Sequence, residues 1–343
     1  MPNFPYLPKR AYFEPDALDY PLGQRIYKTM KELGISIQKT PSHNRVTGIP
    51  GKTPQEKYYE GKNTLVVGVR RSKSFQTCKP SAHFQLPLNT SCPGKCEYCY
   101  LNTTLGKKPY LRVYVNIEEI LGITEEYINQ NTPEITVFEG AATSDPLPTE
   151  PFTGNLARTI EFFAQQKYGR FRFVTKFTNV ESLLALEHNK HTRFRFSLNS
   201  DYVINKFEHS TPSMDERITA AGKISKAEYP LGFIIGPIIL YKSYQEEYRK
   251  LFSILRQTLH SGAFSDLSFE FITHRFTKKA KNQILEVFPH TKLPMEEEER
   301  QFKYGQFGYG KYIYPKKSME ELKSFFMEQV NEFFPEAKVE YFV

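Results

Sequence analysis

Three of the four cysteines in this 343-residue chain lie close together, at Cys92, Cys96 and Cys99. Their spacing, with Pro93 and Gly94 forming a turn, lets three thiolates converge on one soft metal centre. Structural zinc sites usually close with four ligands in two pairs, and no fourth ligand lies near this loop. An iron–sulfur cluster is normally held by four cysteines, so three would leave one iron open to another ligand. A zinc knuckle, or three unrelated buried thiols, is the alternative.

This spacing, with the aromatic Tyr98 just before the last cysteine, resembles the cluster motif of the radical S-adenosylmethionine enzymes. The resemblance implies that Cys92, Cys96 and Cys99 hold a 4Fe-4S cluster. It also implies that the open iron chelates the amino and carboxylate groups of S-adenosylmethionine (AdoMet). An electron donor such as flavodoxin or ferredoxin would then reduce the cluster.

Composition restricts where the chain works. It has no apolar run long enough for a membrane span. Residues 1–5 lack a charged start followed by an apolar stretch, so no signal peptide is expected. Four cysteines, three of them clustered, are not a disulfide framework in a chain this long, which indicates a reduced cytoplasm. A net charge of +8 favours a polyanionic partner such as nucleic acid, but only weakly.

The first 80 residues are expected to form an extension rather than a full domain. A helix is predicted over Asp19–Leu33, closed by Gly34, and a strand over Thr64–Val69. Between them, residues 41–61 are rich in Pro, Gly, Ser and Thr, which indicates an extended loop. The basic run at 70–73 is interpreted as solvated surface.

From residue 81 to 295, strand and helix patterns alternate. Strands are predicted at His83–Leu88, Glu134–Glu139, Phe171–Phe177, Arg193–Leu198, Leu231–Leu240 and Leu267–Thr273. Helices are predicted at Ile117–Asn129, Thr153–Gln166, Val180–Glu187, Met214–Ala227, Tyr244–His260 and Lys279–Val287. Such repetition implies an α/β fold with a parallel sheet, either doubly wound or curled into a barrel. The resemblance implies the second, a partial (β/α)6 TIM-type barrel with the cluster loop after its first strand.

The segment 296–343 breaks the alternation. Aromatic and polar residues alternate around a glycine-bearing centre between Phe302 and Tyr314, which predicts a β-hairpin. An amphipathic helix is predicted over Ser318–Phe334. The expected organisation is an N-terminal extension at 1–80, a barrel at 81–295, and a DNA-contacting hairpin and helix at 296–343.

Two further features narrow the resemblance. Tyr98 and Tyr100 bracket Cys99, and the second predicted strand is followed by the loop Gly140–Asp145. With the basic aromatic tail, they resemble the spore photoproduct lyase family. That resemblance, from about residue 60 to the end, implies a DNA-repair carbon–carbon lyase in the spore core of a spore-forming bacterium. Its substrate would be the methylene-bridged thymine dimer formed by ultraviolet light, from which a 5′-deoxyadenosyl radical removes hydrogen at C6 before the bridging bond breaks.

One position departs from the family pattern. Family members carry a cysteine in the loop after the second strand that returns a hydrogen atom to the thymine radical, and its counterpart here is Ala142. A methyl C–H bond is much stronger than a thiol S–H bond, so alanine is a poor donor. We interpret Ala142 as a Cys→Ala substitution that leaves initiation intact and impairs hydrogen return. The alternative is a natural branch with another donor, for which Cys78 is the only spare thiol.

The resemblance also implies the AdoMet contacts, which lie in the cysteine loop or at the carboxyl ends of predicted strands. The expected set is Ser144 and Asp145 at the methionine end, Lys176 at its carboxylate, Ser197 and Asn199 at the ribose, and Gly236 and Tyr98 at the adenine. Tyr98 and Tyr100 are also expected to pass a radical between donor and cofactor. The alternative for each is an ordinary cap, turn or packing role.

DNA must be bound without reading its sequence, which relies on Lys and Arg against phosphates. The cross-linked dinucleotide is expected to flip out of the duplex into the barrel mouth. His274 and Arg275 are predicted to contact a lesion phosphate. The hairpin is predicted to be the wedge and backbone clamp, through Lys303, Tyr304, Tyr309, Lys311 and Tyr312. The protein is expected to act as a monomer.

Two other functions stay open at this point. One is a different radical AdoMet enzyme, acting on a nucleic acid or a small molecule, which would keep the cluster and barrel but not the lesion. The other is a non-catalytic zinc module that binds nucleic acid.

Overall fold

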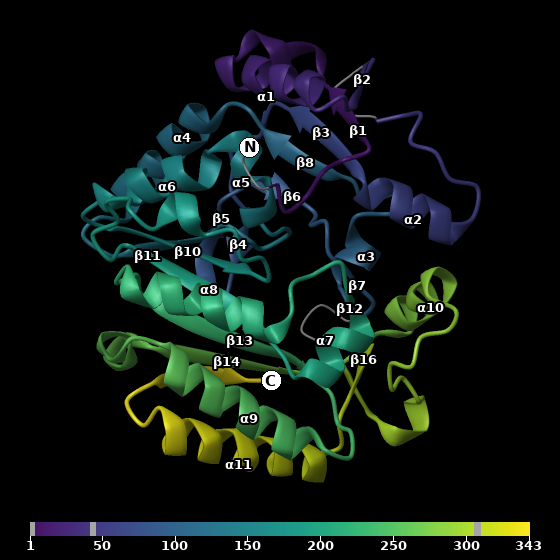
Figure 1. The fold of residues 1–343 in the computed structure, drawn as a ribbon, viewed down its shortest axis with the longest axis vertical. Helices are drawn as coiled ribbons and strands as arrows, with labels where there is room; N and C mark the ends of the chain where they lie inside the picture. Colours follow the sequence, from purple (N-terminus) through teal and green to yellow (C-terminus); the bar gives the residue numbers. More distant parts are fainter. Residues whose placement is uncertain (1–3, 42–45, 305–309) are drawn as a thin grey trace. The chain divides into compact units, whose positions relative to one another are not determined.

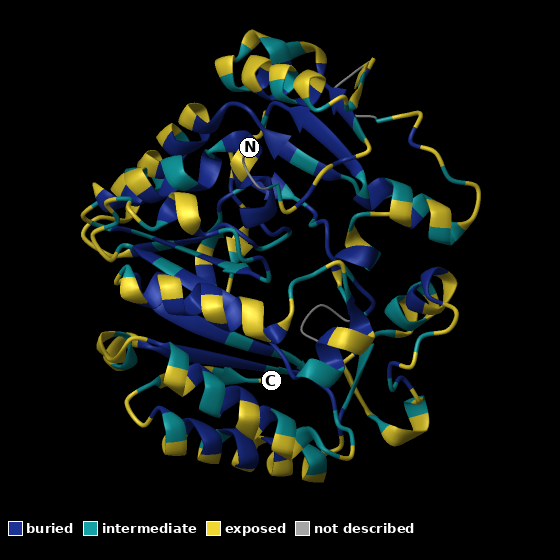
Figure 2. Ribbon diagram, in the orientation of Figure 1, coloured by how far each residue is buried: buried dark blue, intermediate teal, exposed yellow. Residues whose placement is uncertain are grey.

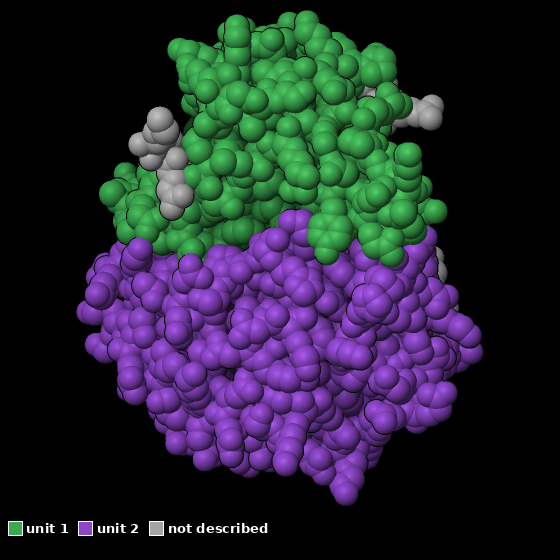
Figure 3. Space-filling model, turned by 45° about the vertical axis from the view of Figure 1, so that its right-hand side comes forward, with its two compact units in different colours: residues 1–93, 105–193 green, residues 94–104, 194–343 purple. Residues whose placement is uncertain are grey.

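The computed structural model describes residues 4–41, 46–304 and 310–343. These residues form two compact units, one of residues 1–93 and 105–193 and the other of residues 94–104 and 194–343 (Figure 3). No helix within the described ranges is long and apolar enough to cross a membrane. The predicted division of roles at residues 81 and 296 stays a prediction.

The first unit contains a five-stranded sheet in the order β2-β1-β3-β8-β6. Its strands are β1 Arg10–Phe13, β2 Ser36–Lys39, β3 Thr64–Gly68, β6 Asn89–Thr90 and β8 Leu111–Tyr114. The helix α1 Pro21–Glu32 packs its buried face, including Ile26 and Met30, against Phe13, Leu65 and Val67 of this sheet. The N-terminal extension therefore has a hydrophobic core of its own, completed by strands from beyond residue 80.

The predicted loop at 41–61 is partly wrong, because α2 spans Pro54–Lys62. Thr53 accepts from the backbone N–H of Glu56 and Glu56 accepts from that of Thr53, which is a capping box. Pro54 occupies the first helical position, where its missing N–H costs nothing. Composition suggested a loop here because Pro and Thr mark helix starts as well as turns.

The first unit also carries four strands in the order β4-β5-β9-β10. They are β4 Thr77–Cys78, β5 Ala82–Gln85, β9 Thr136–Glu139 and β10 Gly169–Thr175. The last three are parallel, and Phe84, Phe138 and Phe171 lie side by side across them. The accompanying helices are α4 Ile117–Asn131, α5 Glu150–Thr153 and α6 Asn155–Ala164.

The second unit continues the pattern with parallel strands in the order β11-β13-β14-β17, where β11 starts two residues before the unit does. They are β11 Thr192–Leu198, β13 Leu231–Ile238, β14 Ser268–Thr273 and β17 Lys338–Phe342. The larger helices are α7 Asp201–Phe207, α8 Met214–Lys226, α9 Tyr244–Thr258, α10 Lys278–Val287 and α11 Lys316–Phe333. Helices α9 and α11 lie side by side, with exposed residues on their outer faces (Figures 1 and 2).

All six strands predicted between residues 81 and 295 are present, and the last strand, β17, was not predicted. Two helices differ from expectation. The segment 153–166 is split, because Gly154 adopts a left-handed conformation with φ of 65° between α5 and α6. The segment 180–187 forms only a 3-10 turn at Glu181–Leu183, since so short a helix is costly to nucleate. The hairpin is confirmed as β15 Gln301–Tyr304 paired with β16 Gly310–Ile313.

A buried ion pair crosses the strands of the second unit. Arg195 on β11 lies 2.8 Å from the Oε1 atom of Glu270 on β14, and the two side chains are 2% and 1% exposed. Gly232 on the intervening β13 makes room, because a Cβ there would lie 3.1 Å from the Arg195 side chain and 2.7 Å from that of Ser268.

Replacing Arg195 with methionine should lower the free energy of unfolding by about 3–5 kcal/mol, because Glu270 would stay buried without its cation. Denaturant unfolding of the full chain, followed by circular dichroism, measures the change. Lys250→Met is the matched control, since its pair with Asp201 is 60% and 43% exposed and its loss should cost less than about 1 kcal/mol. Equal losses in the two variants would contradict the prediction.

Candidate radical AdoMet and DNA-lesion site

The three cysteines predicted to hold the cluster are described in the structure, and none of them is in a disulfide bond. Cys92 is half-buried in the first unit, whereas Cys96 is buried and Cys99 half-buried in the second. Among the described residues, no three His, Cys, Asp or Glu side chains already converge on one metal ion. The loop fits an iron–sulfur cluster through its chemistry, three unoxidised thiols and no fourth cysteine nearby.

The chain just before Cys92 is fixed within the first unit. Ser91 pairs with Ser144, and its backbone N–H donates to the Thr143 carbonyl at 2.9 Å. The Cys92 carbonyl accepts a hydrogen bond of 2.8 Å from Nζ of Lys62, a side chain at the end of α2 that is only 1% exposed. The start of the cysteine loop therefore lies against the loop that contains Ala142.

The rest of the loop is held within the second unit by a two-residue antiparallel ladder between Lys95–Cys96 and Glu208–His209. The loop's next residue, Glu97, is buried, and its Oε1 atom lies 2.7 Å from Nε2 of His209. Its other carboxylate oxygen accepts from the hydroxyl of Thr291. Glu97 thus anchors the loop between Cys96 and Cys99 to two distant parts of the chain.

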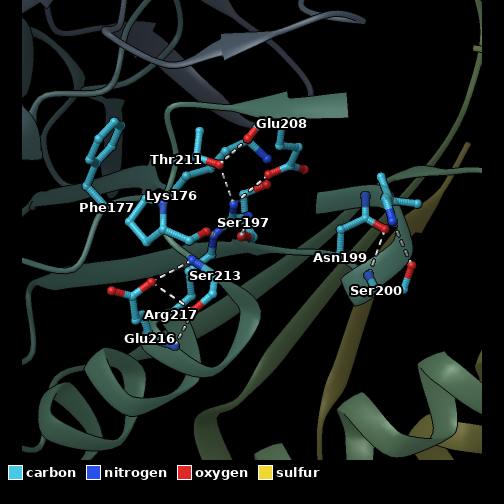
Figure 4. A network of polar contacts seen from close by, with 12 residues as sticks. Lys176, Phe177, Ser197, Asn199, Ser200, Glu208, Thr211, Ser213, Glu216 and Arg217 are labelled. Atoms are coloured by element: carbon cyan, nitrogen blue, oxygen red, sulfur yellow. Dashed lines mark hydrogen bonds and ion pairs between the residues drawn. The ribbon is translucent and has the colours of Figure 1, made fainter. Parts of the chain in front are cut away.

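Tyr98 is linked to a buried ion pair. Its phenol donates to Oε1 of Glu208, whose Oε2 atom accepts from Arg217 at 2.6 Å. Arg217 also donates to the Ser197 carbonyl at 3.0 Å, and Figure 4 shows this guanidinium at the centre of the network. Desolvation and the Glu208 carboxylate raise the pKa of Tyr98 well above its usual range. The phenol therefore keeps its hydrogen at neutral pH. By contrast, Tyr100 is 59% exposed.

The AdoMet residues predicted in the first unit occupy one loop and the strand beside it. The Asp145 carboxylate accepts from the Thr175 hydroxyl at 3.0 Å, from the Lys176 backbone N–H at 2.9 Å and from the Leu147 N–H at 3.2 Å. Ser144 is buried, and its hydroxyl faces the Gly140 carbonyl at 3.5 Å. Asp145 thus ties the loop after β9 to the end of β10, while its role toward AdoMet stays a prediction.

Burial raises the pKa of Asp145 to about 6, although its hydrogen bonds act in the opposite direction. In an unfolded chain an aspartate titrates near about 4, so the folded protein holds the proton more tightly between these values. The Asp145 contribution to stability is therefore full below about pH 4 and is lost as the pH rises to about 6. Asp145→Asn cannot titrate. The difference in unfolding free energy between wild type and variant should therefore change between about pH 4 and pH 6. A constant difference would contradict the raised pKa of Asp145.

The AdoMet residues predicted in the second unit also have structural partners. The Asn199 amide donates to the Pro237 carbonyl at 3.0 Å and accepts from the Tyr248 hydroxyl at 2.5 Å. Gly236 lies directly against β14, because a Cβ there would approach that of Ile272 to 3.0 Å. Asn199 thus connects the carboxyl ends of β11 and β13. The expected contacts of Ser197, Asn199 and Gly236 with the nucleoside stay predictions.

Ala142 lines a cavity of about 200 Å³ in the first unit. Residues from both β-sheets of this unit line it, including Gln76 before β4, Thr90 on β6 and the loop from Gly140 to Ser144. The cavity lies at the carboxyl end of β9, where a parallel barrel carries its sites.

The spare thiol, Cys78, belongs to a hairpin tied to the Ala142 loop. Cys78 pairs with Ala82 between β4 and β5, and the hydroxyl of Ser81 in the connecting turn donates to Glu139 at 2.9 Å. The other Glu139 oxygen accepts from the backbone N–H of Ala141 at 3.1 Å. One buried carboxylate therefore joins the Cys78 hairpin to the loop of the expected hydrogen donor.

The predicted DNA-contacting residues divide into buried and accessible members. His274 is 2% exposed, and burial together with Arg300 lowers its pKa to about 3, so its ring is neutral. Its Nδ1 atom lies 3.2 Å from Arg300. A buried neutral ring is poorly suited to the phosphate contact predicted for it, whereas the neighbouring Arg275 is exposed.

The hairpin gathers positive charge. Lys303 and Lys311 lie directly opposite each other in its antiparallel register. Desolvation, Arg275 and Lys303 lower the pKa of Lys311. Tyr304 is 76% exposed, and Tyr312 donates to Glu297 at 2.6 Å. Tyr309 lies outside the described residues. Like charges directly across a hairpin are destabilising, which favours a site for an anionic partner.

Sequence reasoning missed Glu97, Glu208, His209 and Arg217, the residues that hold the cysteine loop. Tyr98 and Glu208 are 110 positions apart, and Glu97 and Thr291 are 194 apart. The carboxylate between two of the clustered cysteines was the one available signal, because a charged residue in a tight loop requires a partner when it is buried.

Comparisons with known proteins give matches over nearly the whole chain. A family model described as "Spore photoproduct lyase" matches residues 6–343. Curated proteins of the same name are 50% identical in Clostridium acetobutylicum (98% of both chains) and 48% identical in Bacillus subtilis (98% of this chain and 99% of the relative).

Solved structures give the same result. A spore photoproduct lyase mutant with bound AdoMet and dinucleoside spore photoproduct matches with a TM-score of 0.95 and 49% identity, over 99% of this chain and 100% of that chain. A spore photoproduct lyase complexed with the dinucleoside lesion matches equally well in TM-score, 0.95, with 48% identity over 99% and 100% of the two chains. These matches confirm the predicted fold class, a partial (β/α)6 barrel.

Proposed function

The chain belongs to the spore photoproduct lyase family, and on that premise we propose that it repairs spore photoproduct in DNA. The reaction reverts the methylene-bridged thymine dimer to two thymines. The observation that carries the proposal is a match over residues 6–343, which includes the three-cysteine loop. A different radical AdoMet activity and a zinc module are thereby set aside.

Cys92, Cys96 and Cys99 would hold the 4Fe-4S cluster, and AdoMet would bind beside it. When bound, these two groups supply the 5′-deoxyadenosyl radical that removes hydrogen from C6 of the lesion. The protein's part is to position the lesion, exclude water and return one hydrogen atom. Tyr98, fixed by Glu208 and protonated at neutral pH, is suited to transferring that hydrogen atom.

The test is anaerobic reconstitution with iron and sulfide, followed by reaction with AdoMet, a reductant and a synthetic lesion dinucleotide. The expected products are methionine, 5′-deoxyadenosine and the repaired dinucleotide with two intact thymines. A brown protein that cleaves AdoMet but releases no thymine-derived product would reject the substrate. A colourless zinc adduct would reject the cluster.

Hydrogen return is the step in which this chain differs from its family pattern. Ala142 has no thiol, and Cys78 lies in the hairpin that Glu139 joins to the Ala142 loop. We propose that initiation is intact and that return of hydrogen is impaired at position 142. The alternative remains that Cys78 is the donor of a natural branch, and the Glu139 connection supports it.

The proposed partner is double-stranded DNA, with the lesion flipped out of the helix. Arg275, Lys303 and Lys311 support this, because their mutual repulsion would be relieved by phosphates. We also propose that a flavodoxin or ferredoxin reduces the cluster. The protein would act as a monomer in the cytoplasm of the spore core.

Lys303→Gln should weaken DNA binding about equally for all sequences, because the lost contact is to a phosphate. It should also reduce the slope of log affinity against log salt by about one. Fluorescence anisotropy with labelled duplex over a salt series measures both quantities. Lys250→Gln on α9, whose charge is paired with Asp201, is the control. An unchanged slope for Lys303→Gln would exclude this lysine from the DNA contact.

A further inference from the structure

A guanidinium without an ion-pair partner faces the cavity beside Ala142. Arg70 follows β3 and lines this cavity together with residues of the loop from Gly140 to Ser144. Its NH2 group makes one long hydrogen bond, 3.4 Å, to the Ser74 carbonyl. Its Nε atom is buried and makes no hydrogen bond, and no carboxylate in the described part of the chain pairs with it. A buried N–H donor of this kind favours an anionic ligand.

The backbone of Arg70 is held rigidly. Its N–H donates to the side-chain oxygen of Asn116 at 2.8 Å, and its carbonyl accepts from the same side chain at 2.8 Å. Asn116 is 3% exposed and begins α4, directly after β8. The guanidinium carbon lies 5.9 Å from the ring centre of Tyr114, which also lines the cavity. The side chain is therefore positioned before any ligand arrives, which reduces the entropic cost of binding.

Arg70 is the one charged residue among the described residues that line the cavity. The polar groups around it are neutral, including Gln76, Gln85 and Asn89, and the Oδ1 atom of Asn89 is also buried without a hydrogen bond from any described residue. Neutral amides match the imide edge of a thymine base, which offers one donor and two acceptors. A ligand suited to this cavity has one negative charge next to uncharged, hydrogen-bonding rings.

We propose that Arg70 binds the phosphodiester that joins the two nucleosides of the lesion. The inference rests on the proposed function and adds a residue to its substrate site. Arg guanidinium groups bind phosphate through charge-assisted hydrogen bonds, and the Nε–H of Arg70, which has no hydrogen-bond partner among the described residues, supplies one donor. Ala142, at the position of the family's hydrogen donor, lines the same cavity. A phosphate bound to Arg70 would therefore lie close to the thymine methylene that must receive hydrogen. The carboxylate of AdoMet is the competing anion, and the experiment separates the two.

Two lesion compounds and one matched variant provide the test. Binding is measured anaerobically on cluster-loaded protein with AdoMet and no reductant, so that no turnover occurs. The ligands are the lesion dinucleotide, which carries the linking phosphate, and the dinucleoside, which lacks it. Arg71→Met is the control, because Arg71 is the next residue and already pairs with Asp16 at 2.6 Å.

Arg70→Met should weaken binding of the dinucleotide about tenfold or more, the effect of one charge-assisted hydrogen bond. It should leave the dinucleoside unchanged, and Arg70→Lys should recover part of the loss. Arg71→Met should alter neither. An equal loss for both ligands, or a loss of AdoMet affinity alone, would overturn the assignment to phosphate. Failure of the wild-type protein to bind either lesion would instead overturn the proposed function together with this inference.

Discussion

Replacing Ala142 with cysteine is expected to raise, several-fold, the number of thymines recovered for each AdoMet consumed. A thiol gives up hydrogen to a carbon radical far more readily than a methyl group does, and position 142 lines the cavity assigned to the lesion. The measurement is the ratio of thymine to 5′-deoxyadenosine by chromatography under single-turnover and multiple-turnover conditions. Ala142→Ser is the matched control, because it has nearly the same size and polarity without a weak S–H bond.

Replacing Cys78 tests the alternative hydrogen donor. Cys78→Ala in the otherwise unchanged chain should lower thymine recovery if Cys78 donates hydrogen, and should leave recovery unchanged if no thiol donates. In the Ala142→Cys background the same substitution should have little effect. If neither position changes the yield or the product distribution, both donor assignments fail.

Cys96→Ala is expected to abolish AdoMet cleavage, a loss larger than the roughly hundredfold effects of changing groups that only support metal ligands. Two thiolates would remain, and the vacancy for AdoMet depends on three. Iron and sulfide content and the electron paramagnetic resonance signal of the reduced protein measure cluster retention directly. Cys78→Ala should keep the full iron content and so controls for the general loss of a thiol. Retention of iron and signal in Cys96→Ala would remove Cys96 from the ligand set.

Much of the architecture could be predicted from sequence because its strands are short apolar runs separated by helical periodicity. The strand at Thr136–Glu139 and the helix starting at Met214 fall almost where their patterns indicate. In the five-stranded sheet the strand that begins at Thr64 was predicted, but the other strands could not be assigned in the same way. Its strands come from positions as far apart as Arg10 and Tyr114, and strand pairing over such separations leaves no local signal.

In the candidate site, too, residues that depend on distant contacts could not be predicted from the sequence. The cysteines are recognisable because their chemistry depends on close spacing along the chain. Glu208 and Arg217 are ordinary in sequence, and their role depends on burial, since both side chains are fully buried. Arg70 was interpreted as part of a solvated basic run. In the structure Arg70 lines the cavity, whereas Arg71 pairs with Asp16 at the surface.

The buried Lys62 has a consequence for the lifetime of the protein before its cofactors arrive. The residue is 1% exposed, its ammonium donates to the carbonyl of Cys92, and no carboxylate of the described chain pairs with it. A buried cation without an anion costs stability. An iron–sulfur cluster with thiolate ligands would bring negative charge to this neighbourhood. Freshly made, iron-free chains should therefore be the population most readily lost to heat and proteases, so iron supply would influence how much protein accumulates.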